Sequence, residues 1–381
     1  MVYLDYNAST PVDQRILPAL TEAHAVYGNP ASAQHSAGSA AADLIEEARS
    51  RVASLLHRPA QDVLFTSGAT EAATLGLLGA MLSTSDRPNV VVSSTEHKAV
   101  IAAAELGARL SGGEVRCASV GRNGVIDLQM LSDLVDDSVA AVAVMAANNE
   151  TGVINPIFEV GRLAKDSGSL LFVDATQLVG KGSLAGVVET ADLMIFSSHK
   201  IYGPKGAGAL VASRRVQKVL VPIAPGGGQE RGIRGGTHNT PSIVGFGLAA
   251  ELAMKEQPSD ALRVGGLANK LLAALTDAIC GVELNGNDSE RISNTLNLRF
   301  IGADAEAVMA SMPHIMVSAG SACQSGASTP SHVLLAMGLS SSQASESLRI
   351  SLGRPTTSHE VDVAAGAIIA AVSRVRDMTA A

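Results

Sequence analysis

The sequence contains no tryptophan and only three cysteines, and these scarcities exclude several classes of protein. Aromatic residues make up 3% of its 381 residues, which predicts a core of alanine, valine, leucine and isoleucine. Cys117, Cys280 and Cys323 are far apart and odd in number, so we expect no disulfide framework and a reducing compartment. CxxC is absent and the histidines lack the spacing of metal ligands, so no metal site is predicted.

The common nucleotide-binding and zinc-hydrolase motifs are missing as well. GPKGAGAL and GGGQER do not have the spacing of GxGxxG or GxxxxGK[ST], and HExxH does not occur. These absences remove the main support for a P-loop enzyme, a dinucleotide-binding domain or a zinc protease.

Long apolar runs and an excess of positive charge are also absent. Runs such as Val139 to Ala147 are too short to span a bilayer, and the N-terminus lacks a secretory pattern, so we expect a cytoplasmic protein without membrane contact. The formal net charge of −8 disfavours direct nucleic-acid binding. Hydrophobic residues at 46% and charged residues at 17% are typical of a soluble enzyme with a large core.

Short apolar runs alternate with helix-like segments from about residue 14 to 255, which predicts an α/β fold with a mainly parallel sheet. Polar segments follow most of these runs, and five of them, SGATE, STEHK, NNETG, DATQ and SSHK, carry reactive side chains. Because ligands bind at the carboxyl ends of strands in such sheets, we expect one shared site. The predicted strands are Asp62 to Thr66, Asn89 to Ser93, Glu114 to Ala118, Ala140 to Met145, Leu170 to Val173, Leu193 to Phe196 and Gly208 to Val211.

The last third of the chain has a different pattern. A Gly- and Pro-rich stretch from Pro222 to Pro241 predicts an extended functional loop. We divide the chain into a large domain, residues 14–255, and a smaller α+β domain, residues 1–13 and 256–381. The elements predicted for the smaller domain are a helix from Leu262 to Ala278, a strand from Thr295 to Phe300, a loop from Ser318 to Ser328, and a helix from Glu360 to Met378.

Lys200 follows an apolar strand, where partial desolvation would free its amine for Schiff-base chemistry; a solvated loop lysine is the alternative. Asp174 in VDATQ favours the Schiff-base interpretation of Lys200, because a carboxylate at a strand end can accept a hydrogen bond from the ring nitrogen of pyridoxal 5'-phosphate (PLP). Gln177 could reach the ring hydroxyl. These residues favour a PLP enzyme.

Three further polar segments have two interpretations each. SGATE, which opens a helix, suits a phosphate at a helix N-terminus or a plain capping box built on Ser67 or Thr70. His97 could stack on a pyridine ring and move protons, or be a structural histidine. Asn149 could bond the ring oxygen or the substrate, or serve only the NNETG turn.

Cys323 differs from the other two cysteines in its surroundings. It lies in SAGSACQSGASTP, a composition typical of an accessible loop, so its thiol is a candidate nucleophile. Cys117 and Cys280 lie in strand-like and helix-end sequence, and we interpret them as structural.

Together these segments resemble the cysteine desulfurases of the NifS/IscS type, within the class V aminotransferases of fold-type I PLP enzymes. The resemblance runs almost end to end. It covers YLDYNASTPVD, GNPASAQHSAG, FTSGATE, EHK, NNETGVINPI, VDATQ, SSHKIYGPKGAGAL, GGGQERGIRGGTHNTPSIVGF, SAGSACQSGASTPSHVLLAMGL and LRISLGRPTT. It implies a large domain with a mainly parallel seven-stranded sheet, and a smaller domain that carries the catalytic cysteine loop.

The resemblance implies that Lys200 bonds covalently to PLP and removes the α-proton of L-cysteine. It also implies that Asp174 pairs with the pyridinium, Gln177 contacts the ring oxygen, and His97 stacks on the ring and relays protons.

Other implied roles concern the phosphate. Ala69, Thr70, Ser197 and His199 would hold it. Thr237 would reach the phosphate of the neighbouring subunit's cofactor, so the resemblance implies a homodimer with shared sites.

At the substrate end, Asn149 and Arg349 would hold the carboxylate of L-cysteine, which suits a bidentate guanidinium. Cys323 would attack the substrate sulfur and become a persulfide that passes to an acceptor protein. Iron-sulfur cluster assembly, tRNA thiolation and DNA phosphorothioation all draw on this enzyme type.

The sequence departs from the family pattern at two places. Ala72-Ala73-Thr74 replaces a more polar stretch of many relatives, and His238 stands where relatives commonly have Glu.

Three different functions stay open beside the one that the resemblance implies. A selenocysteine lyase or another class V lyase or aminotransferase would not need Cys323. A sulfur-relay scaffold without catalysis would only dock partners. A cysteine hydrolase would pair Cys323 with a histidine such as His314 or His332.

Overall fold

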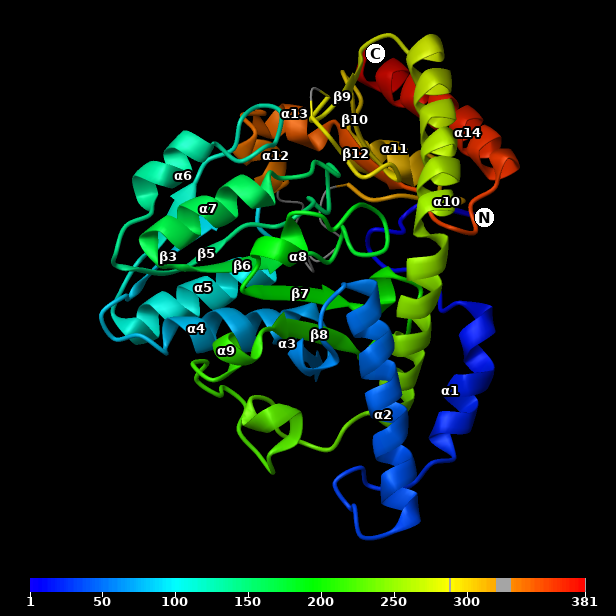
Figure 1. Cartoon of the computed structure of the whole chain (residues 1–381). Helices are drawn as coiled ribbons and strands as arrows, with labels where there is room; N and C mark the ends of the chain where they lie inside the picture. The colour runs from blue at the N-terminus through cyan, green and yellow to red at the C-terminus, as the bar shows by residue number, and fades with distance from the viewer. Residues whose placement is uncertain (288, 320–329, 381) are drawn as a thin grey trace.

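The computed structural model describes residues 1–287, 289–319 and 330–380. A seven-stranded sheet with the strand order β2-β8-β7-β6-β5-β3-β4 forms its centre (Figure 1). Only β8 runs antiparallel to its neighbours β2 and β7, and the other pairs are parallel. The strands are β2 (Val63–Thr66), β3 (Asn89–Ser93), β4 (Val115–Ala118), β5 (Val139–Ala143), β6 (Leu170–Asp174), β7 (Leu193–Ser197) and β8 (Gly208–Ala212).

The prediction of a mainly parallel seven-stranded sheet is confirmed, and every predicted strand is present. The strands of the sheet interior are buried on both faces, which explains why they appear in the sequence as continuous apolar runs. The predicted end of β5 at Met145 is wrong, because β5 ends at Ala143 and the following residues lead into the polar segment beyond the sheet.

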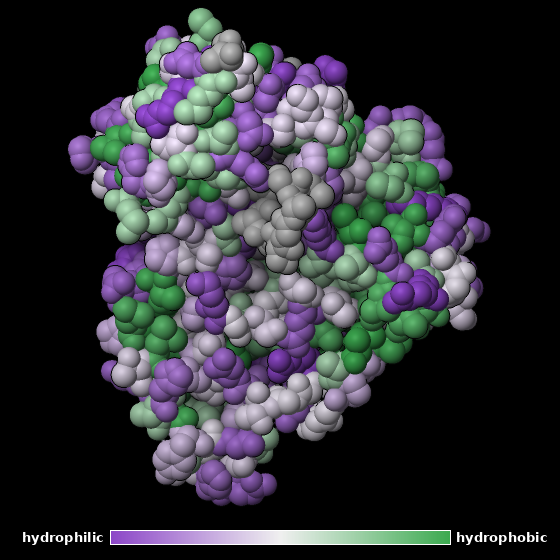
Figure 2. Space-filling model, turned by 180° about the vertical axis from the view of Figure 1, so that it is seen from behind, coloured by the Kyte–Doolittle hydropathy of each residue, from purple (hydrophilic) through white to green (hydrophobic). Residues whose placement is uncertain are grey.

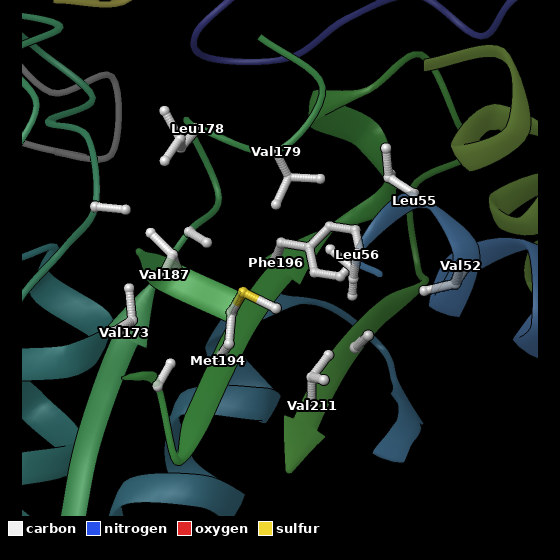
Figure 3. Packing of buried hydrophobic residues seen from close by; sticks show 14 of the residues in the cluster. Val52, Leu55, Leu56, Val173, Leu178, Val179, Val187, Met194, Phe196 and Val211 are labelled. Atoms are coloured by element: carbon white, nitrogen blue, oxygen red, sulfur yellow. The ribbon is translucent and has the colours of Figure 1, made fainter. Parts of the chain in front are cut away.

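Helices cover both faces of this sheet, so the large part of the molecule has three layers (Figure 1). On one face, α2 (Ser36–Leu55), α7 (Ile157–Ser167) and part of α10 (Thr240–Ala278) contribute to one hydrophobic cluster. Figure 3 shows Val52 and Leu56 in this cluster with Met194 and Phe196 of β7. The other face is covered by α3 (Ala69–Ala73), the π-helical turn η3 (Thr74–Leu78), α4 (Gly79–Met81) and α5 (Lys98–Ser111).

A second core lies beside the first and contains both ends of the chain. Val2 and Leu4 pack there with the last helix, α14 (Ser358–Ala380). Its strands are β1 (Val2–Tyr3) with β11 (Ile315–Met316), and the antiparallel set β9 (Val282–Leu284), β10 (Thr295–Phe300) and β12 (Ser347–Ser351). Helix α11 (Ala305–Ser311) also contributes to this core.

Helix α10 differs from its prediction. It begins at Thr240, far before the predicted Leu262, and runs without interruption past Pro258 to Ala278. The Asn239 side chain caps its start by accepting the Ser242 N–H. The helix therefore crosses the predicted boundary at residue 255 and lies along both cores (Figure 1). The division into two domains at that residue stays a prediction.

The remaining helices are short. They are α1 (Leu17–His24), α6 (Leu128–Leu134), α8 (Val187–Thr190), α9 (Arg214–Gln217), α12 (His332–Ala336) and α13 (Ser341–Ser345), with single 3-10 turns η1 (Gln14–Ile16), η2 (Ala60–Asp62), η4 (Ser198–Lys200) and η5 (Gln229–Gly232). Among the described residues, no helix combines the length and apolar character that crossing a membrane requires.

Cys117 and Cys280 are both exposed, so the structure gives neither a role in core packing. Cys117 lies on β4, the edge strand of the large sheet, and Cys280 follows the C-terminal end of α10. Their interpretation as buried structural residues is therefore wrong, and their lack of a catalytic role stays a prediction.

Candidate active site

A cavity of about 220 Å³ lies at the carboxyl ends of the central strands. The segments after β2, β3, β5, β6 and β7 all contribute to its lining, which confirms that the five predicted polar segments meet at one site. The predicted residues that line it are Ala69, Thr70, His97, Asn149, Asp174, Gln177, Ser197, His199, Lys200 and Arg349.

Lys200 stands at the end of η4, directly after β7. Its amine donates hydrogen bonds to the backbone carbonyls of Asn7, at 2.6 Å, and Ala8, at 2.9 Å. The alternative of a solvated loop lysine is wrong, since the amine is held against the first segment of the chain and faces the cavity.

Asp174 is the last residue of β6 and is buried on the same cavity. One carboxylate oxygen accepts the backbone N–H of Thr176 at 2.9 Å. Gln177 follows and is also buried, with its amide nitrogen donating to the Asn7 carbonyl at 3.0 Å. A carboxylate and an amide thus lie near the Lys200 amine.

His97 caps the N-terminus of α5, where its Nδ1 accepts the backbone N–H of Ala99 at 3.1 Å. In the neutral ring the proton therefore lies on Nε2. Burial lowers the pKa of His97, an effect that Asp174 opposes and Lys200 reinforces. His97 is therefore a neutral imidazole near neutral pH, with one N–H to donate.

A corner of small and polar residues lies beside Lys200. Ser197 Oγ accepts the Ala69 backbone N–H at 2.7 Å, and the ring of His199 lies 3.2 Å from Ser9 Oγ. Burial, helped by the nearby charge of Lys200, lowers the pKa of His199 to about 4. The corner offers hydroxyl, imidazole and backbone donors at the start of a helix, a setting that stabilises phosphate.

The alternative of a capping box at this helix is wrong. Gly68 is the N-cap residue and no side chain caps the helix, but Glu71 accepts the Ser67 backbone N–H at 2.5 Å. Ala72 and Ala73 are fully buried, so a more polar residue at either position would lose solvent contact.

Arg349 lies at the other end of the cavity, on β12. One guanidinium nitrogen pairs with Asp5 at 2.7 Å and another donates to the Asn149 carbonyl at 3.1 Å. The Nε atom is buried and has no partner among the described residues. The backbone of Arg349 exchanges two hydrogen bonds with Ser318, just before the undescribed segment 320–329.

Two predicted residues are not part of this cavity. Thr237 is exposed in the loop before α10 and does not line it. Cys323 lies outside the described residues, so its role stays a prediction.

The cavity residues fit PLP in charge and in donors. Lys200 and Arg349 supply positive charge, as a phosphate and a substrate carboxylate require, and Asp174 suits a protonated ring nitrogen. Thr176 Oγ1 is buried without a partner among the described residues, although it lines the cavity. Buried polar groups are normally paired, so this hydroxyl and Arg349 Nε favour a polar ligand.

Asn7, Ala8 and Lys181 also lie at the site, although no role for them is predicted from the sequence. Asn7 and Ala8 line the cavity, and the Lys181 amine donates to the Gln177 and Asn7 side chains. The motif YLDYNAST contains the first two, and its polar residues between apolar ones are a usable signal. Lys181, between two glycines, has the sequence of a solvated turn.

The model of the family "Aminotransferase class-V" matches residues 2–363. The chain belongs to this family. It is 44% identical to a cysteine desulfurase of Frankia sp. (strain EuIK1), over 100% of this chain and 93% of the relative. The chain is therefore a member of the cysteine desulfurase group of the class-V aminotransferases, and the predicted family is confirmed.

Solved structures agree with this assignment. A NifS-like protein matches with a TM-score of 0.87 and 34% identity, covering 98% of this chain and 99% of that one. A structure described as SspA in complex with cysteine matches with a TM-score of 0.81 and 31% identity, covering 92% of this chain and 99% of that one. The fold-type I architecture predicted from the sequence is thus confirmed.

Proposed function

We propose that this protein converts L-cysteine to L-alanine with PLP bound at Lys200, and that the sulfur passes through Cys323 to an acceptor protein. The observation that carries the proposal is the meeting of Lys200, Asp174, His97 and Arg349 on one cavity. When bound, PLP supplies an electron sink for charge that develops at the α-carbon of an amino acid.

The residues of the chain divide the remaining work. Lys200, Asp174 and Gln177 would hold the cofactor ring, with His97 stacked on it. The donors for the phosphate would be Ala69, Thr70, Ser197 and His199.

Arg349 and Asn149 would orient the substrate carboxylate, which places the α-proton and the sulfur. The Lys200 amine would take the α-proton, and the Nε2–H of His97 would serve as a proton donor. The Cys323 thiolate would attack the substrate sulfur and break its bond to carbon. Protonation of that carbon and return of a proton to the α-carbon would give L-alanine, and Cys323 would keep the sulfur as a persulfide.

The deciding experiment measures alanine and sulfide release from L-cysteine with a thiol reductant, in the wild type and in Cys323→Ser, while recording the visible absorbance of the cofactor. We expect the variant to keep its colour and lose sulfide release. Cys117→Ser is the matched control, because that thiol is exposed on an edge strand. Equal sulfide release from the wild type and Cys323→Ser would indicate a lyase that does not use Cys323. A wild type that binds no PLP would contradict the proposal.

We also propose a homodimer in which Thr237 completes the partner's phosphate site. The supporting observations are that Thr237 is exposed outside its own cavity and that apolar side chains gather in patches on one face (Figure 2). Mixing Thr237→Val and Lys200→Ala proteins should restore tight cofactor binding in hybrid dimers, because one of the two sites is then intact. A monomer in solution would contradict the proposed homodimer.

The cytoplasmic location stays a prediction.

A further inference from the structure

Asn7 uses all its hydrogen-bonding capacity, although it belongs to a short irregular segment at the start of the chain. A backbone N–H, a carbonyl and a side-chain amide can together make about seven hydrogen bonds, counting about two for each oxygen and two for the amide nitrogen. Asn7 is 1% exposed and makes all of them. The partners are Ser351, Lys200, Gln177, Thr295, the Asn149 carbonyl, Lys181 and Asn294.

These bonds join the reactive amine to the second core of the molecule. The Asn7 carbonyl accepts from Lys200 at 2.6 Å and from Gln177 at 3.0 Å. The Asn7 side chain donates to Thr295 of β10 at 2.8 Å. The position of the carbonyl that holds the Lys200 amine therefore depends on the partners of the Asn7 side chain.

One of those partners is a second lysine. Lys181 donates to the Asn7 side-chain oxygen at 3.2 Å and makes a shorter hydrogen bond to the side-chain oxygen of Gln177. No carboxylate lies within ion-pair distance of its amine in the part of the chain that the structure describes, which distinguishes it from an ordinary surface lysine. Lys181, Asn7 and Gln177 thus form a closed triangle, in which Lys181 donates to the two side-chain oxygens and Gln177 donates to the Asn7 backbone carbonyl.

The charged neighbours of Lys181 are mainly positive. Lys200 and Arg349 face it from the cavity side, and burial together with these two cations lowers its pKa well below the usual lysine value. On its other side a small second cavity contains Asp260 and Arg354, which pair with each other at 2.7 Å. A lysine in such a place costs stability, so a contribution to the site would explain its presence.

We propose that Lys181 is a positioning residue of the active site, which fixes the Gln177 amide and, through Asn7, the carbonyl that holds the Lys200 amine. The lysine supplies the donors that hold both oxygens, and Gln177 keeps its nitrogen for Asn7. The inference rests on the proposed function, because Gln177 and Lys200 matter as the groups that hold PLP.

The test compares PLP affinity of the apoprotein, measured by absorbance, in the wild type, Lys181→Met and Lys165→Met. Lys165 is the matched control, since it is an exposed lysine on α7. We expect Lys181→Met to weaken PLP binding about tenfold, the order of magnitude that the loss of one hydrogen bond gives. KM for L-cysteine should stay within about twofold, because Arg349 and Asn149 keep their contacts, while kcat falls.

A double-mutant cycle separates positioning from general destabilisation. In a Gln177→Ala background, Lys181→Met should weaken PLP binding clearly less than in the wild type, because the lysine then has one oxygen less to hold. An equal loss in both backgrounds, or no difference between Lys181→Met and the Lys165→Met control, would overturn the proposal. If Lys181→Met does not fold, Lys181→Gln keeps a polar donor and replaces it.

These outcomes are distinct from failure of the proposed function. PLP affinity is measured without L-cysteine, so it reports on Lys181 even if the sulfur chemistry is wrong. A wild type that binds no PLP would overturn both proposals together.

Discussion

Two polar clusters of the molecule differ in how their charges are paired. In the first, Arg49 and Glu230 form a bidentate ion pair with distances of 2.8 and 2.9 Å. Glu230 also accepts from the Phe65 backbone at 2.9 Å and lies 2.6 Å from the His238 ring. Every charge of this cluster has a partner of opposite sign or a backbone donor.

The active site is the second cluster, and its basic groups are not all paired with carboxylates: Arg349 pairs with Asp5, but no carboxylate lies within ion-pair distance of the Lys181 amine among the described residues. Lys181, Lys200 and Arg349 lie together, and burial lowers the pKa of His97 and His199. Two buried atoms there, Thr176 Oγ1 and Arg349 Nε, have no hydrogen-bond partner among the described residues. The difference indicates that the paired cluster holds the fold together, whereas the clustered basic side chains and unpartnered donors of the active site are suited to anionic ligands.

The paired cluster also accounts for one departure from the family pattern. His238, which stands where relatives commonly have Glu, shares a hydrogen bond with Glu230 Oε1. A glutamate there would place a second carboxylate beside Glu230. His238 therefore suits the local charge better in this chain.

The largest expected effect comes from breaking the paired cluster. Glu230→Gln leaves Arg49 as a buried cation without a counter-charge and should lower the free energy of unfolding by roughly 3–5 kcal/mol. Urea unfolding measures this, and the cofactor absorbance of the folded variant should not change. Glu251→Gln is the control, since its ion pairs with Lys255 and Arg51 are solvent-accessible and each worth less than about 1 kcal/mol. Equal losses in the two variants would remove the contrast between the clusters.

A smaller effect should distinguish the clusters by pH. The pKa of His199 is lowered from 6.5 to about 4, so between these values the unfolded chain binds more protons and the apoprotein loses stability as pH falls. The pKa of Glu230 is lowered from 4.5 to about 2, so its stabilisation is present above pH 4.5 and is lost only as pH falls toward 2. As the pH falls, the stabilisation that depends on neutral His199 in the active site should therefore be lost before the stabilisation from Glu230 in the paired cluster.

His199→Asn tests this order. Between pH 7 and pH 5 the variant should lose less unfolding free energy than the wild type, by about 1 kcal/mol after allowing for the partial exposure of His199. His359→Asn is the control, because His359 is exposed at the start of α14. Urea unfolding of the apoprotein at both pH values is the measurement, and identical pH dependence of wild type and His199→Asn would contradict the prediction.

The sequence predicted the sheet and most of the cavity lining, because both follow from local patterns. Apolar runs mark buried strands, and parallel strands bring their carboxyl ends to one edge. This logic reaches Lys200 and Asp174 without knowledge of any tertiary contact. It also explains the accurate bounds of β3 and β10, which agree with the prediction at both ends.

Contacts between distant segments could not be predicted in this way. Asn7 and Lys200 are 193 residues apart, and Arg49 and Glu230 are 181 apart, so no local pattern joins them. Lys181 has the flanking glycines of a solvated turn, and only its hydrogen bond to Asn7 shows that its amine lies at the active site. The predicted helix from Leu262 is too short because α10 begins within a Gly- and Pro-rich stretch, where Asn239 supplies a cap.

The smallest expected effect concerns the two thiols outside both clusters. Cys117 and Cys280 are exposed and pack in no core, so replacing both by serine should change the unfolding free energy by less than about 0.5 kcal/mol. Sulfide release should also stay within about twofold, because neither residue lines the cavity. Mass spectrometry of the Cys117→Ser/Cys280→Ser protein after one turnover should then find one added sulfur, on Cys323. A variant that loses the persulfide together with these thiols would assign the sulfur to one of them and overturn the role of Cys323.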